Sequence, residues 1–179
     1  MVNNGIPLKN LVIFASGSGS NAEKIFEYFK DSTEVLITHI FSNNPEAGVI
    51  SRAERLAIPC TVFNRAEYKD GTLLKKIQSL NTDWVILAGF LWLIPSDFIQ
   101  AYPQRIVNLH PALLPKFGGK GMYGHFVHEA VVEAGEKESG ITIHFVNEHY
   151  DEGGIIFQSS FAVDPSDTPE DVAKKGQVL

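Results

Sequence analysis

The sequence predicts an α/β fold built on a doubly wound, mostly parallel sheet whose C-terminal strands are partly antiparallel. Short β-rich segments alternate with helical segments, which is typical of right-handed βαβ units with helices on both faces of the sheet. A Gly-rich turn joins the first strand-like segment to the first helical one. The last two strand-like segments lie close together in the sequence, which favours antiparallel pairing.

The individual elements follow from hydrophobic periodicity and from turn and cap residues. The first helix carries Ile25, Phe26 and Phe29 on one side, and Thr168 followed by Pro169 is typical of a helix start. The predicted strands are residues 11–16, 34–43, 60–63, 83–90, 105–110, 141–146 and 154–163. The predicted helices are residues 21–30, 47–57, 68–80, 125–135 and the segment that follows Thr168.

The composition indicates a single globular domain over residues 1–179. The chain is 44% hydrophobic and 20% charged, and no repeat or linker-like tract divides it. The final helix reaches Leu179 without a stop signal, so we expect part of the C-terminal helix to be missing. The net charge of -6 at pH 7 offers no basic surface, so nucleic acid is not an expected partner.

Other features favour a cytoplasmic protein with no membrane partner. No apolar run reaches the roughly 18 residues that a membrane-spanning helix needs, and residues 1–10 lack the pattern of a secretory signal. Cys60 is the only cysteine, which excludes an internal disulfide and a cysteine metal cluster. It follows Pro59 in an expected strand, so we predict a buried, inert thiol.

The segment "NLHPALLP" places an amide and an imidazole at the end of an expected strand. Alternate side chains of a strand leave the same face, so Asn108 and His110 should project side by side. Pro111 favours extended geometry at His110 and ends the ladder there. Open parallel sheets place their chemistry at such strand ends. A strand tip with two ordinary hydrogen-bonding residues is the alternative interpretation.

The turn "GSGSN", residues 17–21, follows the first strand and opens the first helix. Its backbone N–H groups and the positive end of the helix dipole would meet there, which suits an anion. With Ala22 it also matches the dinucleotide pattern G-x-G-x-x-G/A, but the second expected strand ends without the acidic residue that ribose binding needs. A small phosphate ester is therefore the favoured ligand, with a tight structural turn as the alternative. The later "GGKGMYG" stretch fails the P-loop pattern and is expected to form a loop near the site.

The remaining histidines and acids give one further candidate, Asp151, in the turn between the last two expected strands. Gly153 and Gly154 follow it and allow a close approach of the backbone. If the sheet brings this turn beside the fifth strand, Asp151 can reach His110. His39 and His144 are expected to be ordinary strand histidines, and no metal-ligand spacing is present. The competing acids are Glu148 and Glu152.

Together, several segments resemble the glycinamide ribonucleotide formyltransferases, a branch of the folate-dependent formyltransferase family. The matching segments are "ASGSGSN", "FSNNPEAG", "LAGFLWLIP", "VNLHPALLP", "ITIHFV" and "YDEGG", in the order and approximate spacing of the family. The resemblance runs from about residue 11 to the end of the chain. The N-x-H-P element with a later Asp is common to the wider family, whereas the G-S-G-S-N turn points to the ribonucleotide branch.

The resemblance implies a role for each matching position. Asn108, His110 and Asp151 would form a catalytic trio. The chain departs from the family at Trp92, where relatives commonly carry an arginine, and Arg65 looks like the family's arginine near the folate glutamate tail. The residues implied to bind the ribonucleotide phosphate are Gly19, Ser20 and Asn21. The residues implied to bind folate are Arg65, Leu91, Trp92, Leu93, Ile94 and Asn108.

The resemblance further implies transfer of a formyl group from 10-formyltetrahydrofolate to the amine of glycinamide ribonucleotide in purine biosynthesis, by direct attack and without a metal. Asn108 and protonated His110 would donate hydrogen bonds to the developing oxyanion. Asp151 would raise the pKa of His110 and position a proton-relaying water. The expected assembly is a monomer or a homodimer. One alternative is another member of the family, such as formyltetrahydrofolate hydrolase, and a second is a non-catalytic sugar-phosphate-binding module. A nicotinamide-dependent oxidoreductase is disfavoured because the second expected strand lacks the acidic residue that binds ribose.

Overall fold

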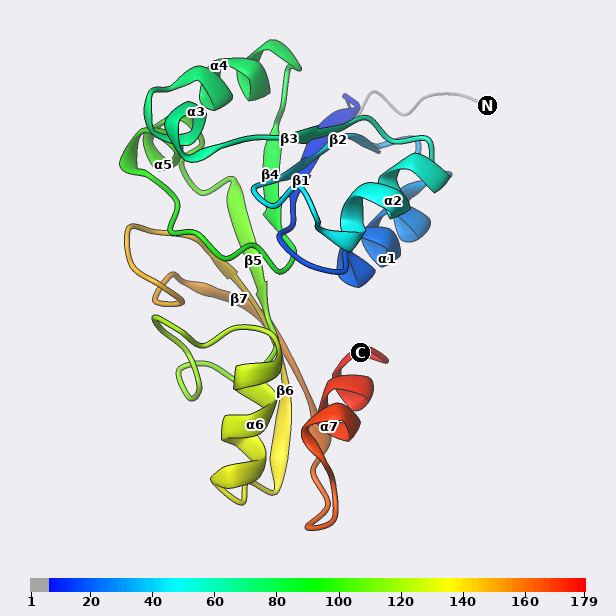
Figure 1. Cartoon of the computed structure of the whole chain (residues 1–179), viewed down its shortest axis with the longest axis vertical. Coiled ribbons are helices and arrows are strands. Elements are labelled where there is room, and N and C mark those ends of the chain that lie inside the picture. Colours follow the sequence, from blue (N-terminus) through cyan, green and yellow to red (C-terminus); the bar gives the residue numbers. More distant parts are fainter. Residues whose placement is uncertain (1–6) are drawn as a thin grey trace. The chain divides into compact units, whose positions relative to one another are not determined.

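The computed structural model describes residues 7–179, which divide into two compact units (Figure 1). The first unit ends at Ile106 and the second is Val107–Leu179. Most of the segment tested above for a secretory signal, residues 1–6, lies outside the described residues. No helix between residues 7 and 179 is long and apolar enough to cross a membrane. A single domain over the whole chain stays a prediction.

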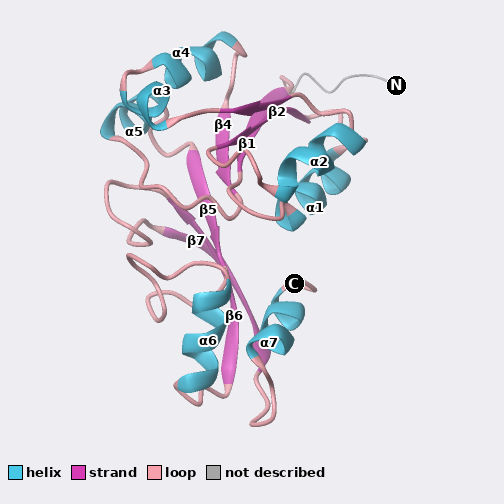
Figure 2. Cartoon of the chain, viewed as in Figure 1, coloured by secondary structure: helices cyan, strands magenta, loops and turns pink. Residues whose placement is uncertain are grey.

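The first unit contains a parallel sheet in the order β3-β2-β1-β4. Strand and helix alternate along the chain (Figure 2), as the sequence predicts. The strands are β1 (Lys9–Phe14), β2 (Val35–Ser42), β3 (Cys60–Val62) and β4 (Trp84–Leu87). The helices are α1 (Ser20–Phe29), α2 (Gly48–Arg55), α3 (Arg65–Lys69), α4 (Thr72–Ser79) and α5 (Ser96–Ala101).

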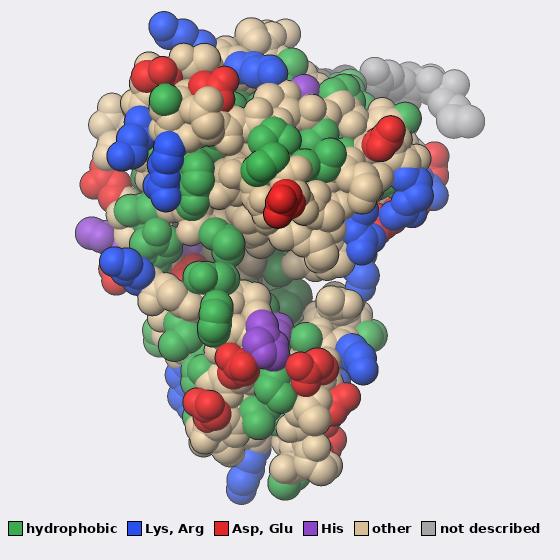
Figure 3. All heavy atoms as spheres, viewed as in Figure 1, with side chains coloured by type: hydrophobic (Ala, Val, Ile, Leu, Met, Phe, Trp, Pro, Cys, Tyr) green, Lys and Arg blue, Asp and Glu red, His purple; other side chains and the backbone are tan. Residues whose placement is uncertain are grey.

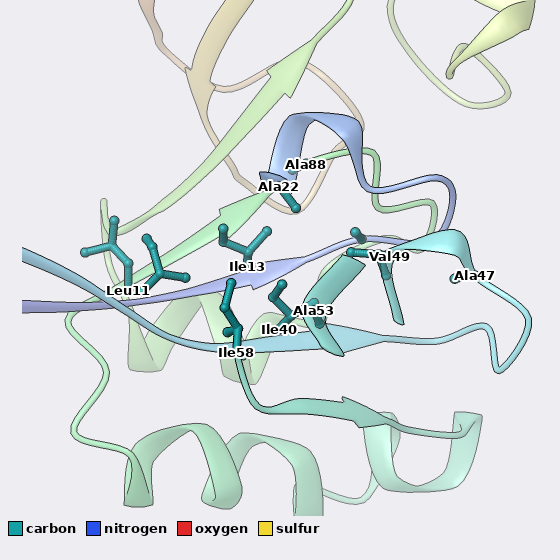
Figure 4. Packing of buried hydrophobic residues seen from close by; sticks show 11 residues of the cluster. Leu11, Ile13, Ala22, Ile40, Ala47, Val49, Ala53, Ile58 and Ala88 are labelled. Atoms are coloured by element: carbon teal, nitrogen blue, oxygen red, sulfur yellow. The ribbon is translucent and has the colours of Figure 1, made fainter. Parts of the chain in front are cut away.

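Helices cover both faces of this parallel sheet because β1 and β2 are apolar on both sides. On the α1–α2 face, Ile13 and Ile40 pack with Ala22, Val49 and Ala53 (Figure 4). On the α3–α5 face, the Phe14 ring contacts several aromatic rings at centroid distances of 5.2–6.4 Å. These rings belong to Phe41, Phe63, Phe90 and Phe98.

The helices of this unit differ from the predicted ones at two places. The predicted helix 68–80 is two helices, because Gly71 adopts a left-handed conformation with φ 83° and Asp70 accepts a hydrogen bond from the Thr72 N–H. Helix α5 was not predicted, since its six residues are too few to show a periodic pattern. Cys60 lies in β3 as expected but is half-buried rather than buried, and burial raises the pKa of its thiol.

The second unit is built on antiparallel strands in the order β5-β6-β7, with β5 beginning at Ile106. The parallel strands of the first unit and these antiparallel strands confirm the predicted fold class, which is Rossmann-like. Helix α7 has the predicted Thr168 cap, completed by Asp171. The elements are β5 (Ile106–His110), α6 (His125–Glu133), β6 (Glu138–Phe145), β7 (Ile155–Ala162) and α7 (Pro169–Gly176).

Candidate active site

Asn108 and His110 lie at the end of β5, as the sequence predicts. Strand β6 runs antiparallel beside them, with Asn108 opposite His144 and His110 opposite Thr142. His110 is the last residue of β5 and is only 2% exposed. The proline that follows it cannot donate to the ladder, so the strand ends at this point.

Asp151 reaches both of these side chains from the turn between β6 and β7. Its Oδ1 lies 3.6 Å from His110 Nδ1 and accepts a 3.3 Å hydrogen bond from Asn108 Nδ2. The Asp151 backbone has φ 58°, a left-handed conformation that Asp and Asn tolerate better than most residues. Gly153 allows the turn to approach β6, since a Cβ there would lie 1.6 Å from the Phe145 carbonyl oxygen. The structure therefore brings the three predicted catalytic residues together. The competing acids, Glu148 and Glu152, are exposed.

The loop after β5 is fastened to two of these residues. Phe117 O accepts a 2.8 Å hydrogen bond from His110 Nε2, and Gly119 N–H donates a 2.9 Å bond to Asp151 Oδ2. This places part of the Gly-rich stretch near the cluster, as the sequence predicts. His110 thus lies between two oxygen acceptors, one on each ring nitrogen.

Asp151 acts to raise the pKa of His110, as the sequence analysis expects, but the net shift of this pKa is downwards. Burial lowers the pKa of His110 below its ordinary value of 6.5, although the Asp151 carboxylate and the Phe117 carbonyl act to raise it. The expectation included the carboxylate but not the loss of water around a ring that is 2% exposed. For Asp151, burial acts to raise the pKa, but the neighbouring His144 ring, the His110 charge and the Gly119 N–H together hold it below its usual range.

His144 belongs to the same cluster, which the sequence reasoning missed. It lies in a strand and is buried, as expected, but its Nε2 is 3.1 Å from Asn108 Nδ2 and 3.5 Å from Asp151 Oδ1. The only signal in the sequence is a polar residue in the apolar strand "ITIHFV". His39, by comparison, pairs with Thr61 in the first unit, with 2.7 Å between His39 Nε2 and Thr61 Oγ1.

The turn predicted to bind phosphate opens α1 in the first unit. Gly19 is the N-cap with φ 77°, and no side chain caps the helix there. A Cβ on Gly19 would lie 2.5 Å from Val49 Cγ2, so only glycine fits between α1 and α2. Ser20 and Asn21 form the first turn of α1, where backbone N–H groups have no partner within the helix.

The surroundings of this turn are polar and partly basic. Arg52 and Arg55 of α2 both pair with Glu23 of α1. Lys and Arg side chains gather over α1 and α2 in the space-filling view (Figure 3). An open cavity of about 490 Å³ beside the turn is lined by Ser18, Gly48, Ser51, Arg52 and Arg55.

The end of β2 carries amides where a dinucleotide site would have a carboxylate. Asn43 Oδ1 accepts a 2.6 Å hydrogen bond from Ser16 Oγ, and Asn44 Nδ2 donates a 3.2 Å bond to the Ser16 carbonyl. These bonds fasten the first turn to the end of β2. They do not offer the acidic acceptor that dinucleotide binding requires.

The segment predicted to contact folate, residues 91–94, lies after β4. Leu91 and Leu93 are 38% and 40% exposed, whereas Ile94 is buried. The Leu93 carbonyl accepts a 3.0 Å hydrogen bond from the Tyr68 hydroxyl, which fixes the backbone. Trp92 packs against aromatic rings and lies under Arg65, whose guanidinium carbon is 3.9 Å from the ring centroid. Arg65 and Trp92, both implied to bind folate, are therefore in direct contact.

Among residues 7–179, no group of three or more His, Cys, Asp or Glu side chains could hold a metal ion. The cluster formed by β5, β6 and the turn after β6 instead contains two imidazoles, a carboxylate and an amide in polar contact. Such groups can donate to an oxygen that gains negative charge and can move a proton.

The chain belongs to the formyl transferase family, whose model matches residues 9–179. It is 47% identical over 174 residues to the chloroplastic phosphoribosylglycinamide formyltransferase of Arabidopsis thaliana, covering 93% of this chain and 60% of that protein. It is 33% identical over 174 residues to the phosphoribosylglycinamide formyltransferase of Bacillus subtilis, covering 94% of this chain and 87% of that protein. Glycinamide ribonucleotide transformylase 1 from Symbiobacterium toebii superposes with a TM-score of 0.87 at 30% identity, covering 96% of this chain and 81% of that one.

The share of the relatives that this chain spans differs from one to another. It covers 60% of the A. thaliana protein and 55% of the chloroplastic phosphoribosylglycinamide formyltransferase of Vigna unguiculata. The names of these relatives agree with the family resemblance found in the sequence motifs.

Proposed function

We propose that this protein transfers the formyl group of 10-formyltetrahydrofolate to the amine of glycinamide ribonucleotide, a step of purine biosynthesis. The observation that supports this most is the cluster of Asn108, His110 and Asp151, in a chain whose relatives are named for this reaction. The amine attacks the formyl carbon, and the carbonyl electrons move to the oxygen. The amine then loses a proton and the folate nitrogen gains one. The electrons on the oxygen re-form the carbonyl as the bond between the folate nitrogen and the formyl carbon breaks, which leaves the formyl group on the amine and releases the folate.

His110 is the proposed donor to the developing oxyanion. Only the imidazolium form donates hydrogen bonds from both ring nitrogens, and both nitrogens face oxygen acceptors. Burial opposes that charge in the free protein. A negative oxygen on the substrate would favour the charged form when it is needed, provided that His110 Nε2 exchanges the Phe117 carbonyl for that oxygen.

Asp151 is the proposed partner of the His110 charge and of the amine proton. Its depressed pKa keeps the carboxylate ionised near neutral pH. It can hold the imidazolium through Oδ1 and accept a proton directly or through a water. The Asn108 bond to Asp151, at 3.3 Å, is longer than usual, so this N–H is the one that can turn towards a substrate oxygen.

We assign the ribonucleotide phosphate to Gly19, Ser20 and Asn21. The uncapped start of α1 offers N–H groups and a positive helix dipole, which suit a phosphate. The nearby Arg52 and Arg55 add positive charge, of which Glu23 neutralises a part.

We assign the folate to the segment that contains Leu91, Trp92, Leu93 and Ile94, and its glutamate tail to Arg65. The exposed leucines offer apolar contact beside a fixed backbone. The guanidinium of Arg65 suits a carboxylate, while Trp92 supports it from below by a cation–π contact. The expected monomer or homodimer and the expected cytoplasmic location stay predictions; two of the relatives above are named as chloroplastic.

A formyl-transfer assay tests the proposal. The deformylated folate is followed by absorbance with glycinamide ribonucleotide present and omitted. We expect turnover only when the amine is present. Turnover that is independent of the amine would identify a formyltetrahydrofolate hydrolase, and binding of the ribonucleotide without turnover would identify a sugar-phosphate-binding module.

A further inference from the structure

His144 has a hydrogen-bonding state that its neighbours fix. Its ring is 1% exposed, so water does not compete for its nitrogens. Nδ1 lies 2.8 Å from the Phe145 carbonyl oxygen, which can only accept a hydrogen bond. The hydrogen of the neutral ring therefore belongs on Nδ1, and Nε2 is left as an acceptor.

The acceptor on His144 faces the side-chain amide of Asn108. The two residues are directly opposite each other in the β5–β6 ladder, and Nε2 is 3.1 Å from Asn108 Nδ2. The second hydrogen on Asn108 Nδ2 points to Asp151 Oδ1 at 3.3 Å. If the Asn108 amide were flipped, its oxygen would face the His144 Nε2 lone pair and the Asp151 carboxylate, which are both acceptors. Both neighbours therefore favour the orientation in which the Asn108 NH₂ group faces them.

Asp151 and His144, the two partners of the Asn108 amide, have different parts in the proposed reaction. The Asp151 carboxylate takes part in proton movement and in the pairing with His110, so its charge and contacts change. The bond between His144 and Asn108 involves no reacting group. It can therefore hold the amide in place while the other N–H turns from Asp151 to a substrate oxygen.

We propose that His144, as the Nδ1–H tautomer, is a positioning residue that holds the Asn108 amide with its N–H groups on the catalytic side. This inference rests on the proposed formyl transfer. In this role His144 acts through Asn108 and not on a substrate atom. Its loss should lower kcat rather than raise either KM, because a donor that contacts the developing oxyanion matters most in the transition state.

Two variants separate positioning from packing. His144→Leu fills similar space but removes the acceptor, and His144→Gln offers an amide oxygen that can accept from Asn108 in place of Nε2. We expect His144→Leu to lower kcat by roughly 10²-fold, the effect of a small misplacement of a catalytic group, with both KM values little changed. His144→Gln should recover most of this loss. The matched control is His39→Gln, a buried strand histidine that pairs with Thr61 and should leave kcat unchanged.

A spectroscopic measurement tests the same inference without turnover. Long-range ¹⁵N–¹H correlation spectra of the free protein, assigned by comparison with His144→Gln, report which ring nitrogen carries the hydrogen. We expect Nδ1–H for His144, whereas a free imidazole prefers Nε2–H. If His144→Leu does not fold, the tautomer seen in the spectrum and the kcat of His144→Gln still test the inference.

The inference is overturned if His144 is the Nε2–H tautomer, if folded His144→Leu keeps the parent kcat, or if His144→Gln loses as much activity as His144→Leu. If the proposed function were wrong, the parent protein itself would show no formyl transfer. The three outcomes above are distinct from this, because they concern only the state and the effect of His144.

Discussion

Replacing Asp151 with Asn removes one negative charge from the cluster. The new side chain is still compatible with the left-handed backbone conformation at this position. The left-handed φ of 58° is tolerated by Asn as well as by Asp. The Asn oxygen can still accept the Gly119 N–H, so the loop contact should survive. The substitution therefore tests the charge of Asp151 more than its shape.

The geometry sets the size of the expected effect. The His110 and Asp151 side chains are 3% and 9% exposed, with 3.6 Å between Nδ1 and Oδ1. At an effective dielectric constant of about 20, a charged pair at that distance attracts by roughly 4–5 kcal/mol. The Asn dipole and nearby water should recover part of this, so we expect kcat to fall by roughly 10²–10³-fold. Both KM values should change less than kcat, because the carboxylate acts mainly in the transition state.

The pH profile provides a second readout of Asp151→Asn. Asp151 acts to raise the pKa of His110 against the effect of burial, so without it the pKa should fall further below its ordinary value. Activity that needs the charged imidazole should then be lost at a lower pH than in the parent. The control is Glu152→Gln, an exposed acid in the same turn, which should change neither rate nor profile. If Asp151→Asn keeps the parent rate and pH profile, the trio does not act as described.

The remaining predictions concern the donor, the phosphate turn, the tail site and stability. His110→Ala should lower kcat by roughly 10²–10³-fold in a protein that still folds, and a near-normal kcat would remove His110 from the mechanism. Asn21→Leu should raise KM for the ribonucleotide and leave KM for the folate little changed; steady-state kinetics with each substrate varied would expose the opposite pattern. Trp92→Ala should weaken binding of folates that carry a glutamate tail more than of those without it, because it removes the ring that supports Arg65, and calorimetry that finds equal losses for both folates would contradict the assignment. The free energy of unfolding should decrease between pH 7.5 and 5.5, because buried histidines with lowered pKa bind fewer protons when folded than when unfolded, and urea unfolding at the two pH values measures this. These histidines are His39, His110 and His128.

Local sequence patterns predicted that Asn108 and His110 lie at the end of a strand and that Asp151 lies in a turn between two strands, whereas the choice of Asp151 over Glu148 and Glu152 came from the family resemblance. Strand alternation places Asn108 and His110 on one face, and a proline ends the strand after them. Two glycines after Asp151 indicate the turn that brings it close to β6. Each of these inferences depends on residues within a few positions of one another.

Features that depend on contacts between distant segments could not be predicted in the same way. The proposed role of His144 depends on the register that sets it opposite Asn108, and no local pattern gives that register. The lowered pKa of His110 follows from burial and from a loop whose Phe117 and Gly119 meet the cluster. The break before α4 could have been predicted from the sequence, because Asp70-Gly71 is a recognised turn signal. The prediction of one helix over residues 68–80 gave more weight to the helical periodicity than to this signal.

The fate of a ¹³C-labelled formyl group tests the central claim most directly. The protein is mixed with 10-formyltetrahydrofolate that carries ¹³C in the formyl group, together with glycinamide ribonucleotide, and the label is followed by NMR. The account predicts that the signal moves from the folate to a new formamide on the ribonucleotide, and that His110→Ala slows this transfer. Release of the label as free formate, or a signal that stays on the folate, would contradict the account.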